Sequence, residues 1–146
     1  MKKRSFATLG VLALLAAGSA FGQTTLRFDI PFEFHFLNKV MPAGQYDVNV
    51  ATNNVRHLLS LECYACRSHV YSTTFGIGGG NPPDEGRLVF NKYGETYFLS
   101  EVWTPGDSQG GGLTKSKTES ETARTTPSVA RVTMPARKGQ VTIARR

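Results

Sequence analysis

The chain has 146 residues and a formal net charge of +6, so its length suits one domain and excludes two ordinary ones. The charge is unevenly distributed. Residues 1–22 contain three basic and no acidic side chains, residues 23–114 have a net charge of −3, and residues 115–146 have a net charge of +6. The high positive charge therefore belongs to the two ends of the chain and says little about the partners of its middle segment.

The N-terminal segment has the layout of a bacterial secretory signal peptide. Basic residues at Lys2–Arg4 precede an uncharged apolar run at 6–17, and small residues follow at 18–22. The run has about a dozen residues, whereas a membrane-spanning helix needs about 20. We therefore predict that residues 1–22 are removed, with cleavage after Gly22 or Ala20, and that the protein is secreted or periplasmic with no membrane span after cleavage.

The first predicted strand region is Leu26–Phe36, where every even position is apolar and the odd positions are mostly charged. This period of two residues is typical of a half-buried strand. Pro31 cannot donate a ladder hydrogen bond, so the region is either an edge strand or two short strands that meet at a bend. The chain then reverses at a predicted β-turn, Met41–Gly44.

The rest of the middle segment also predicts short strands separated by turns. Gly94 is expected at positive φ in a hairpin turn, and the Gly- and Pro-rich stretch 78–83 is expected to be a surface loop. The further strands are predicted at Tyr46–Val50, Arg56–Cys63, His69–Ile77, Arg87–Asn91 and Thr96–Trp103, with a turn at Asn53–Asn54. The fold class is therefore all-β, a small antiparallel sandwich or barrel of about six to eight strands.

The strand pattern ends near Trp103. Residues 104–112 are rich in turn-forming residues and predict a spacer. Ser116 and Glu119 have the spacing of a capping box, which favours a short helix at Lys117–Arg124. The remainder has few bulky apolar residues, so we favour a flexible basic tail over the alternative of one extra strand at Val141–Ile143.

These features divide the chain into a signal peptide (1–22), a β domain (23–114) and a short helix with a basic tail (115–146). The tail is a candidate for attachment to anionic polymers of the cell envelope. Nucleic acid is not the expected partner, because the tail has no aromatic side chains on which bases could stack.

Four segments of the β region resemble, in the same order, a family of small secreted proteins from soil bacteria whose function is uncharacterised. The segments are Ile30–Phe34, Pro42–Tyr46, Arg87–Gly94 and Tyr97–Ser100. The resemblance covers roughly residues 26–124 and implies export and a shared all-β domain. It implies no activity and no binding residues.

The two cysteines, Cys63 and Cys66, are the strongest chemical candidates. Their CxxC spacing occurs in thiol–disulfide enzymes, but the βαβ context of those enzymes is missing. In an extended strand the two Cα atoms would be about 10 Å apart, too far for a disulfide, whereas a β-turn would bring them within reach. An oxidising compartment favours a structural disulfide, with free thiols and redox chemistry as alternatives.

Metal binding is a further alternative for the same cysteines. Together with His69 and His57 they could supply a tetrahedral zinc site, although no second CxxC or spaced histidine pair is present. Haem attachment is not expected, because Arg67 stands where CxxCH requires a histidine.

No motif in the chain indicates a catalytic site. Asp29 and Glu33 would lie about 13 Å apart on a straight strand, wider than the 5–9.5 Å of glycosidase carboxylate pairs. No GxSxG, HExxH or phosphate-binding loop occurs. The sequence therefore predicts a non-enzymatic, exported binding or structural module of the cell envelope or extracellular space, without a cofactor. The alternative is a small extracytoplasmic redox or metal-binding protein that uses Cys63 and Cys66.

Overall fold

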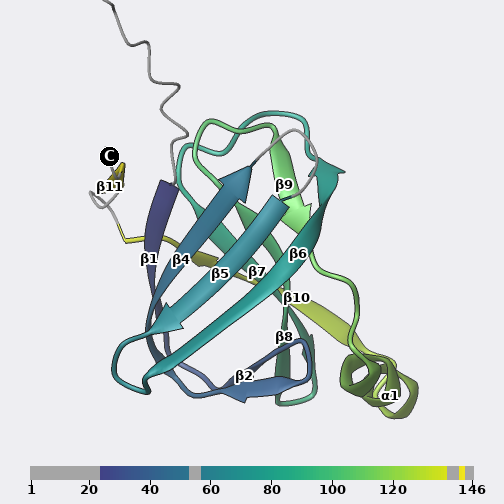
Figure 1. Ribbon diagram of the computed structural model, residues 1–146. Coiled ribbons are helices and arrows are strands. Elements are labelled where there is room, and N and C mark those ends of the chain that lie inside the picture. Colours follow the sequence, from purple (N-terminus) through teal and green to yellow (C-terminus); the bar gives the residue numbers. More distant parts are fainter. Residues whose placement is uncertain (1–23, 53–56, 138–141, 144–146) are drawn as a thin grey trace, which may run out of the picture.

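The computed structural model describes residues 24–52, 57–137 and 142–143, so the predicted signal peptide and the predicted turn at Asn53–Asn54 lie outside the described residues. Within them the chain forms eleven strands and one helix (Figure 1). The elements are β1 (Thr24–Ile30), β2 (Phe34–Phe36), β3 (Lys39–Met41), β4 (Gly44–Thr52), β5 (His57–Cys63), β6 (Ser68–Gly78), β7 (Arg87–Tyr93), β8 (Thr96–Trp103), β9 (Gln109–Gly112), α1 (Lys117–Thr125), β10 (Val129–Pro135) and β11 (Thr142–Ile143).

The strands form a sheet in the order β10-β7-β8-β9-β6-β5-β4-β1-β11, and β2 and β3 form a hairpin beside β8. The long strand β6 pairs with β5 through its first part and with β9 through its last four residues. In Figure 1, β1, β4, β5 and β6 make up the near layer, and β7, β8 and β10 cross behind them. The all-β class is confirmed, but the strand count is higher than predicted and the sheet is not closed.

One hydrophobic core lies between the two layers. Leu26, Phe28 and Ile30 of β1 are all buried, as the even-position pattern predicted. Phe34 continues the pattern on β2, and its ring contacts those of Tyr46 and Phe90 at centroid distances of 5.2 and 5.3 Å. The strand breaks between β1 and β2, where Pro31 lies. The alternative of two short strands that meet at a bend is therefore the correct one.

Several of the turns that connect neighbouring strands contain a residue at positive φ. Gly94 has φ 59° between β7 and β8, as predicted for that hairpin. Leu37 has φ 56° between β2 and β3, a conformation that is uncommon for a residue with a side chain. All three pairs of the β2–β3 ladder are antiparallel, whereas β2 meets β8 in a parallel bridge between His35 and Phe98.

The predicted spacer at 104–112 was wrong in its last part, because Gln109–Gly112 forms β9. Glycine is a poor strand residue, but here it leaves room for a neighbouring ring. A Cβ atom at Gly110 would lie 2.7 Å from two carbons of the Trp103 ring, and one at Gly79 would lie 2.2 Å from it. Trp103 is only 6% exposed, so the ring packs against glycine backbone.

The predicted flexible tail was wrong for Val129–Pro135, which forms β10 and pairs with β7 along its whole length. Val132, Met134 and Ala136 pack against the core with the two-residue period of a strand. The alternative strand at 141–143 is present as β11 over Thr142–Ile143, and Val141 lies outside the described residues. Since β10 belongs to the sheet, the predicted domain boundary at 114 is not a boundary of the fold.

Helix α1 begins as predicted and ends one residue later than predicted. The Ser116 hydroxyl accepts a hydrogen bond from the Glu119 backbone N–H at 3.1 Å, which is half of a capping box. The Glu119 carboxylate instead accepts hydrogen bonds from Asn91 and from Tyr93. These bonds join Glu119, the buried residue in the first turn of the helix, to β7.

Candidate functional site

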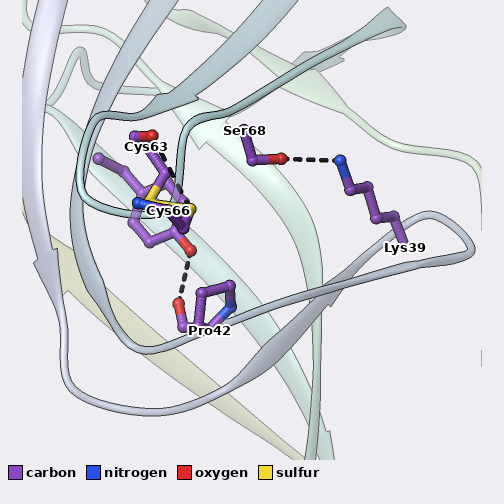
Figure 2. Close-up of a disulfide and its surroundings, with 6 residues drawn as sticks. Lys39, Pro42, Cys63, Cys66 and Ser68 are labelled. Carbon is purple, nitrogen blue, oxygen red and sulfur yellow. Dashed lines mark hydrogen bonds between the residues drawn. A yellow bond between two sulfur atoms is a disulfide. The ribbon is translucent and has the colours of Figure 1, made fainter.

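The cysteine pair lies in the turn between β5 and β6. The Cα atoms of Cys63 and Cys66 are 5.5 Å apart and the sulfur atoms are joined in a disulfide (Figure 2). The backbone N–H of Cys66 donates to the Cys63 sulfur, and Arg67 follows with φ 49°. Cys63 belongs to the core at 2% exposure, so the turn is fixed directly to the packed interior.

One side-chain hydrogen bond links this turn region to β3, and a second lies within the neighbouring β3–β4 segment. The Lys39 ammonium donates to the Ser68 hydroxyl at 2.7 Å, and the Tyr46 hydroxyl donates to the Pro42 carbonyl (Figure 2). Burial raises the pKa of Tyr46 to about 12, so the phenol remains a neutral donor at physiological pH.

The outer face of the near layer carries a row of ionisable residues in register across four strands. Arg27 pairs with Asp47, Asp47 with Glu62, and Glu62 with His69. Arg27 donates to both oxygens of the buried Asp47 carboxylate, at 2.6 and 2.9 Å, and these bonds raise the pKa of Arg27. The carboxylates of Glu62 and Asp47 raise the pKa of the exposed Tyr64. Most of the charge in this row is therefore already paired within the protein.

The next part of the same face is mainly aromatic. We call Leu58, His69, Tyr71, Thr73 and Phe75 the β6 face, because four of them alternate outward along β6 and Leu58 pairs with Thr73 from β5. Tyr71 is 58% exposed, Phe75 is 52% exposed and Leu58 is 42% exposed. The rings of His69 and Tyr71 lie against each other with centroids 4.4 Å apart.

The β6 face inverts the ordinary pattern of a half-buried strand. The core-facing side chains of β6 include the small polar Ser68 and Ser72, which pair with Cys63 and Leu59. The bulky rings of Tyr71 and Phe75 face solvent instead. The register with β5 imposes this arrangement, because β5 buries Leu59, Leu61 and Cys63.

A shallow groove adjoins one end of the β6 face. It lies between the β2–β3 turn, with Leu37 and Lys39, and the start of β6, with His69 and Tyr71. The Phe75 ring covers Gly112 at the other end, since a Cβ atom at Gly112 would lie 2.6 Å from two of its carbons. Both exposed rings are therefore supported from one side by neighbouring structure.

The other candidate residues from the sequence do not form a site. Cys63 and Cys66 are paired and so present no thiolates to a metal, and the His57 side chain lies outside what the structure describes. In the described part of the chain, no group of three or more His, Cys, Asp or Glu residues is arranged to hold a metal ion. Asp29 forms an ion pair with Arg137.

The basic C-terminal region is partly neutralised by the sheet. Arg131 forms an ion pair with Glu101, and Arg137 forms the pair with Asp29 at 2.5 Å. These two cations are therefore engaged with acidic residues of β8 and β1, which weakens the hypothesis of a separate electrostatic tail. Among the described residues, no helix has the length and hydropathy needed to cross a membrane.

Comparisons with known proteins find no matching family model, no matching curated protein and no matching solved structure. The resemblance to small secreted proteins of soil bacteria therefore stays a prediction.

Proposed function

We propose that this protein is an exported, non-enzymatic β domain that acts in the cell envelope or outside the cell as a binding module. The observation that carries the proposal is the inverted pattern of β6, with Tyr71 and Phe75 exposed and small polar residues beneath them. Such a strand gives up burial of apolar surface that would have stabilised the fold. The exposure of Leu58, Tyr71 and Phe75 together on one sheet face makes that face the candidate interaction site.

Two features support export. The N-terminal segment has the charge, length and small-residue pattern of a signal peptide. The cysteine pair lies at disulfide distance, and disulfides persist in oxidising compartments. Intact-mass analysis of the protein from a secreting host should show the loss of residues 1–20 or 1–22, and a product that still begins at Met1 would contradict export.

Binding is tested with the cell-envelope fraction of the producing organism. Immobilised mature wild-type protein should retain envelope material, and the immobilised Tyr71→Ser variant should retain much less of it. Val129→Thr is the matched control, because Val129 is similarly exposed at 51% but lies on β10. Equal retention by the wild type and Tyr71→Ser would contradict the β6 face as the binding surface.

Redox chemistry at Cys63 and Cys66 is the competing function. A shallow hollow lined by Tyr64, Arg67 and His69 opens beside the disulfide, and a nearby cation favours a thiolate. The burial of Cys63 argues against it, because thiol–disulfide exchange requires access to the attacked sulfur and only the half-buried Cys66 is then open to attack. Catalytic turnover of a dithiol reductant by the purified protein would favour this function over binding.

A further inference from the structure

We infer that the β6 face binds an uncharged saccharide chain, with sugar rings stacked on Tyr71 and Phe75. This inference rests on the proposed binding function and names the ligand class for the same surface. Three properties of the face lead to it, namely the spacing of its rings, the absence of Asp, Glu, Lys and Arg from its five residues, and its small apolar area.

The spacing of the rings suits an extended ligand. Tyr71 and Phe75 are four residues apart on one side of a continuous strand, so their Cα atoms are separated by about 13 Å. Thr73 lies between them and offers a hydroxyl at the same face. The site is a track along β6 that continues into the groove beside Lys39, so several units of a chain can contact it at once.

The chemistry of the track suits the faces of sugar rings. The face of an aromatic ring carries negative charge density, which attracts the polarised C–H groups on one side of a pyranose. Hydroxyls of Thr73 and Tyr71 can then bond the sugar hydroxyls at the rim. This combination of stacking with a few polar groups is the usual way in which a site fixes a ligand's orientation.

The scarcity of charged side chains along the track favours an uncharged chain as its ligand. Among Val70–Ile77 and their strand partners on β5 and β9, as far as the structure describes them, there is no Asp, Glu, Lys or Arg. The strand pairs that border this stretch add acidic residues, Glu62 opposite His69 and Glu101 opposite Gly112. Nucleic acids and anionic polymers are bound chiefly by rows of cations. Lys39, the cation in the adjoining groove, already donates to Ser68. A neutral polymer therefore fits better than an anionic one.

The apolar area of the track is too small for a stable protein partner. Its exposed large apolar side chains are Leu58, Tyr71 and Phe75, in a strip about one strand wide. A stable protein interface usually buries about 800 Å² on each side with 20–30 residues. A polysaccharide, which contacts a protein along a narrow line, needs no such area.

Affinity electrophoresis tests the inference with the mature protein. Native gels contain β-1,4-glucan, β-1,3-glucan, xylan or mannan as neutral probes, and alginate as an anionic probe. At least one neutral polymer should slow the wild type, with an effect that salt does not change. Tyr71→Ser and Phe75→Thr should each weaken this binding about tenfold, whereas Val129→Thr should not.

The controls separate this inference from the function on which it rests. Both substituted rings are more than half exposed, and an unchanged melting temperature would verify folding. One outcome overturns the saccharide inference alone: no neutral polymer binds, but envelope material is still retained through Tyr71. That material would then prove to be protein or an anionic polymer whose binding is salt-sensitive, and the proposal of a binding module would stand. If no envelope material is retained through Tyr71, both are overturned.

Discussion

Replacing Gly110 by alanine should destabilise the fold, because β9 is packed against Trp103. The new methyl carbon would lie 2.7 Å from two ring carbons and 2.9 Å from a third, whereas carbon atoms in good contact are about 3.5–4.0 Å apart. The ring is held in place, since its Nε1–H donates to Glu101 at 2.9 Å and the Arg87 guanidinium lies 5.0 Å from the ring centroid. The clash must therefore move either the ring or the strand.

The expected cost is that of overpacking, about 1–3 kcal/mol, which corresponds to a melting temperature lower by roughly 4–10 °C for a domain of this size. Gly76→Ala is the matched control. Gly76 lies in β6 and pairs with Gly111 of β9, and a Cβ atom added to it would have no neighbouring atom within 4 Å. We expect a change within about 0.5 kcal/mol there.

Thermal unfolding followed by circular dichroism measures both variants. The double variant Gly110→Ala with Trp103→Leu should cost less than the sum of the two single changes, because the smaller side chain relieves the clash. Equal melting temperatures for Gly110→Ala and the wild type would refute the packing of β9 against Trp103.

Three further predictions concern stability. Reduction of Cys63–Cys66 should lower the free energy of unfolding by about 2 kcal/mol, because the closed loop is short, and intact mass should rise by two hydrogens; unchanged mass would contradict the disulfide. The free energy of unfolding should fall as the pH rises from about 10 to about 12, because the pKa of Tyr46 is near 10 in the unfolded chain and about 12 in the folded protein. Urea unfolding measured over this pH range should show that Tyr46→Phe removes the part of the pH dependence that Tyr46 causes. Deleting residues 126–146 should lower the free energy of unfolding by about 3 kcal/mol or more, because it removes β10 with Val132 and Met134. An unchanged melting temperature would support a flexible tail instead.

Local patterns predicted the parts of the fold that depend on neighbouring residues in the sequence. The strict alternation of Leu26–Phe36 defined both faces of β1 and β2, and Pro31 marked the bend between them. The spacing of Ser116 and Glu119 located the start of α1. Each of these signals lies within about ten residues, so no tertiary information was needed.

The missed strands depend on distant residues. The glycines of β9 are tolerated because the rings of Trp103 and Phe75 cover them. The composition of residues 104–112 gives no indication that these two rings pack there. In β10 the apolar residues Val132 and Met134 alternate with Arg131 and Thr133, a pattern too sparse to outweigh the entropy of ordering a tail. Pairing with β7 supplies the missing stabilisation.

The sequence predicted the cysteine pair of the candidate site but not the β6 face. CxxC spacing identified Cys63 and Cys66, because a β-turn brings their Cα atoms within disulfide reach whereas an extended strand does not. The β6 face was not found, since a period of two residues defines two faces without saying which is buried. The bulky side chains of His69–Ile77 would ordinarily be placed inward, and only the register with Leu59 of β5 turns Tyr71 outward.

Amide NMR of the ¹⁵N-labelled mature protein, titrated with solubilised envelope polysaccharide, tests the central proposal most directly. Shift changes should be confined to Leu58, His69–Phe75 and the adjoining Leu37–Lys39 turn. Changes centred on Cys63–Cys66 or on the basic residues after Pro135, with the β6 face unaffected, would contradict it.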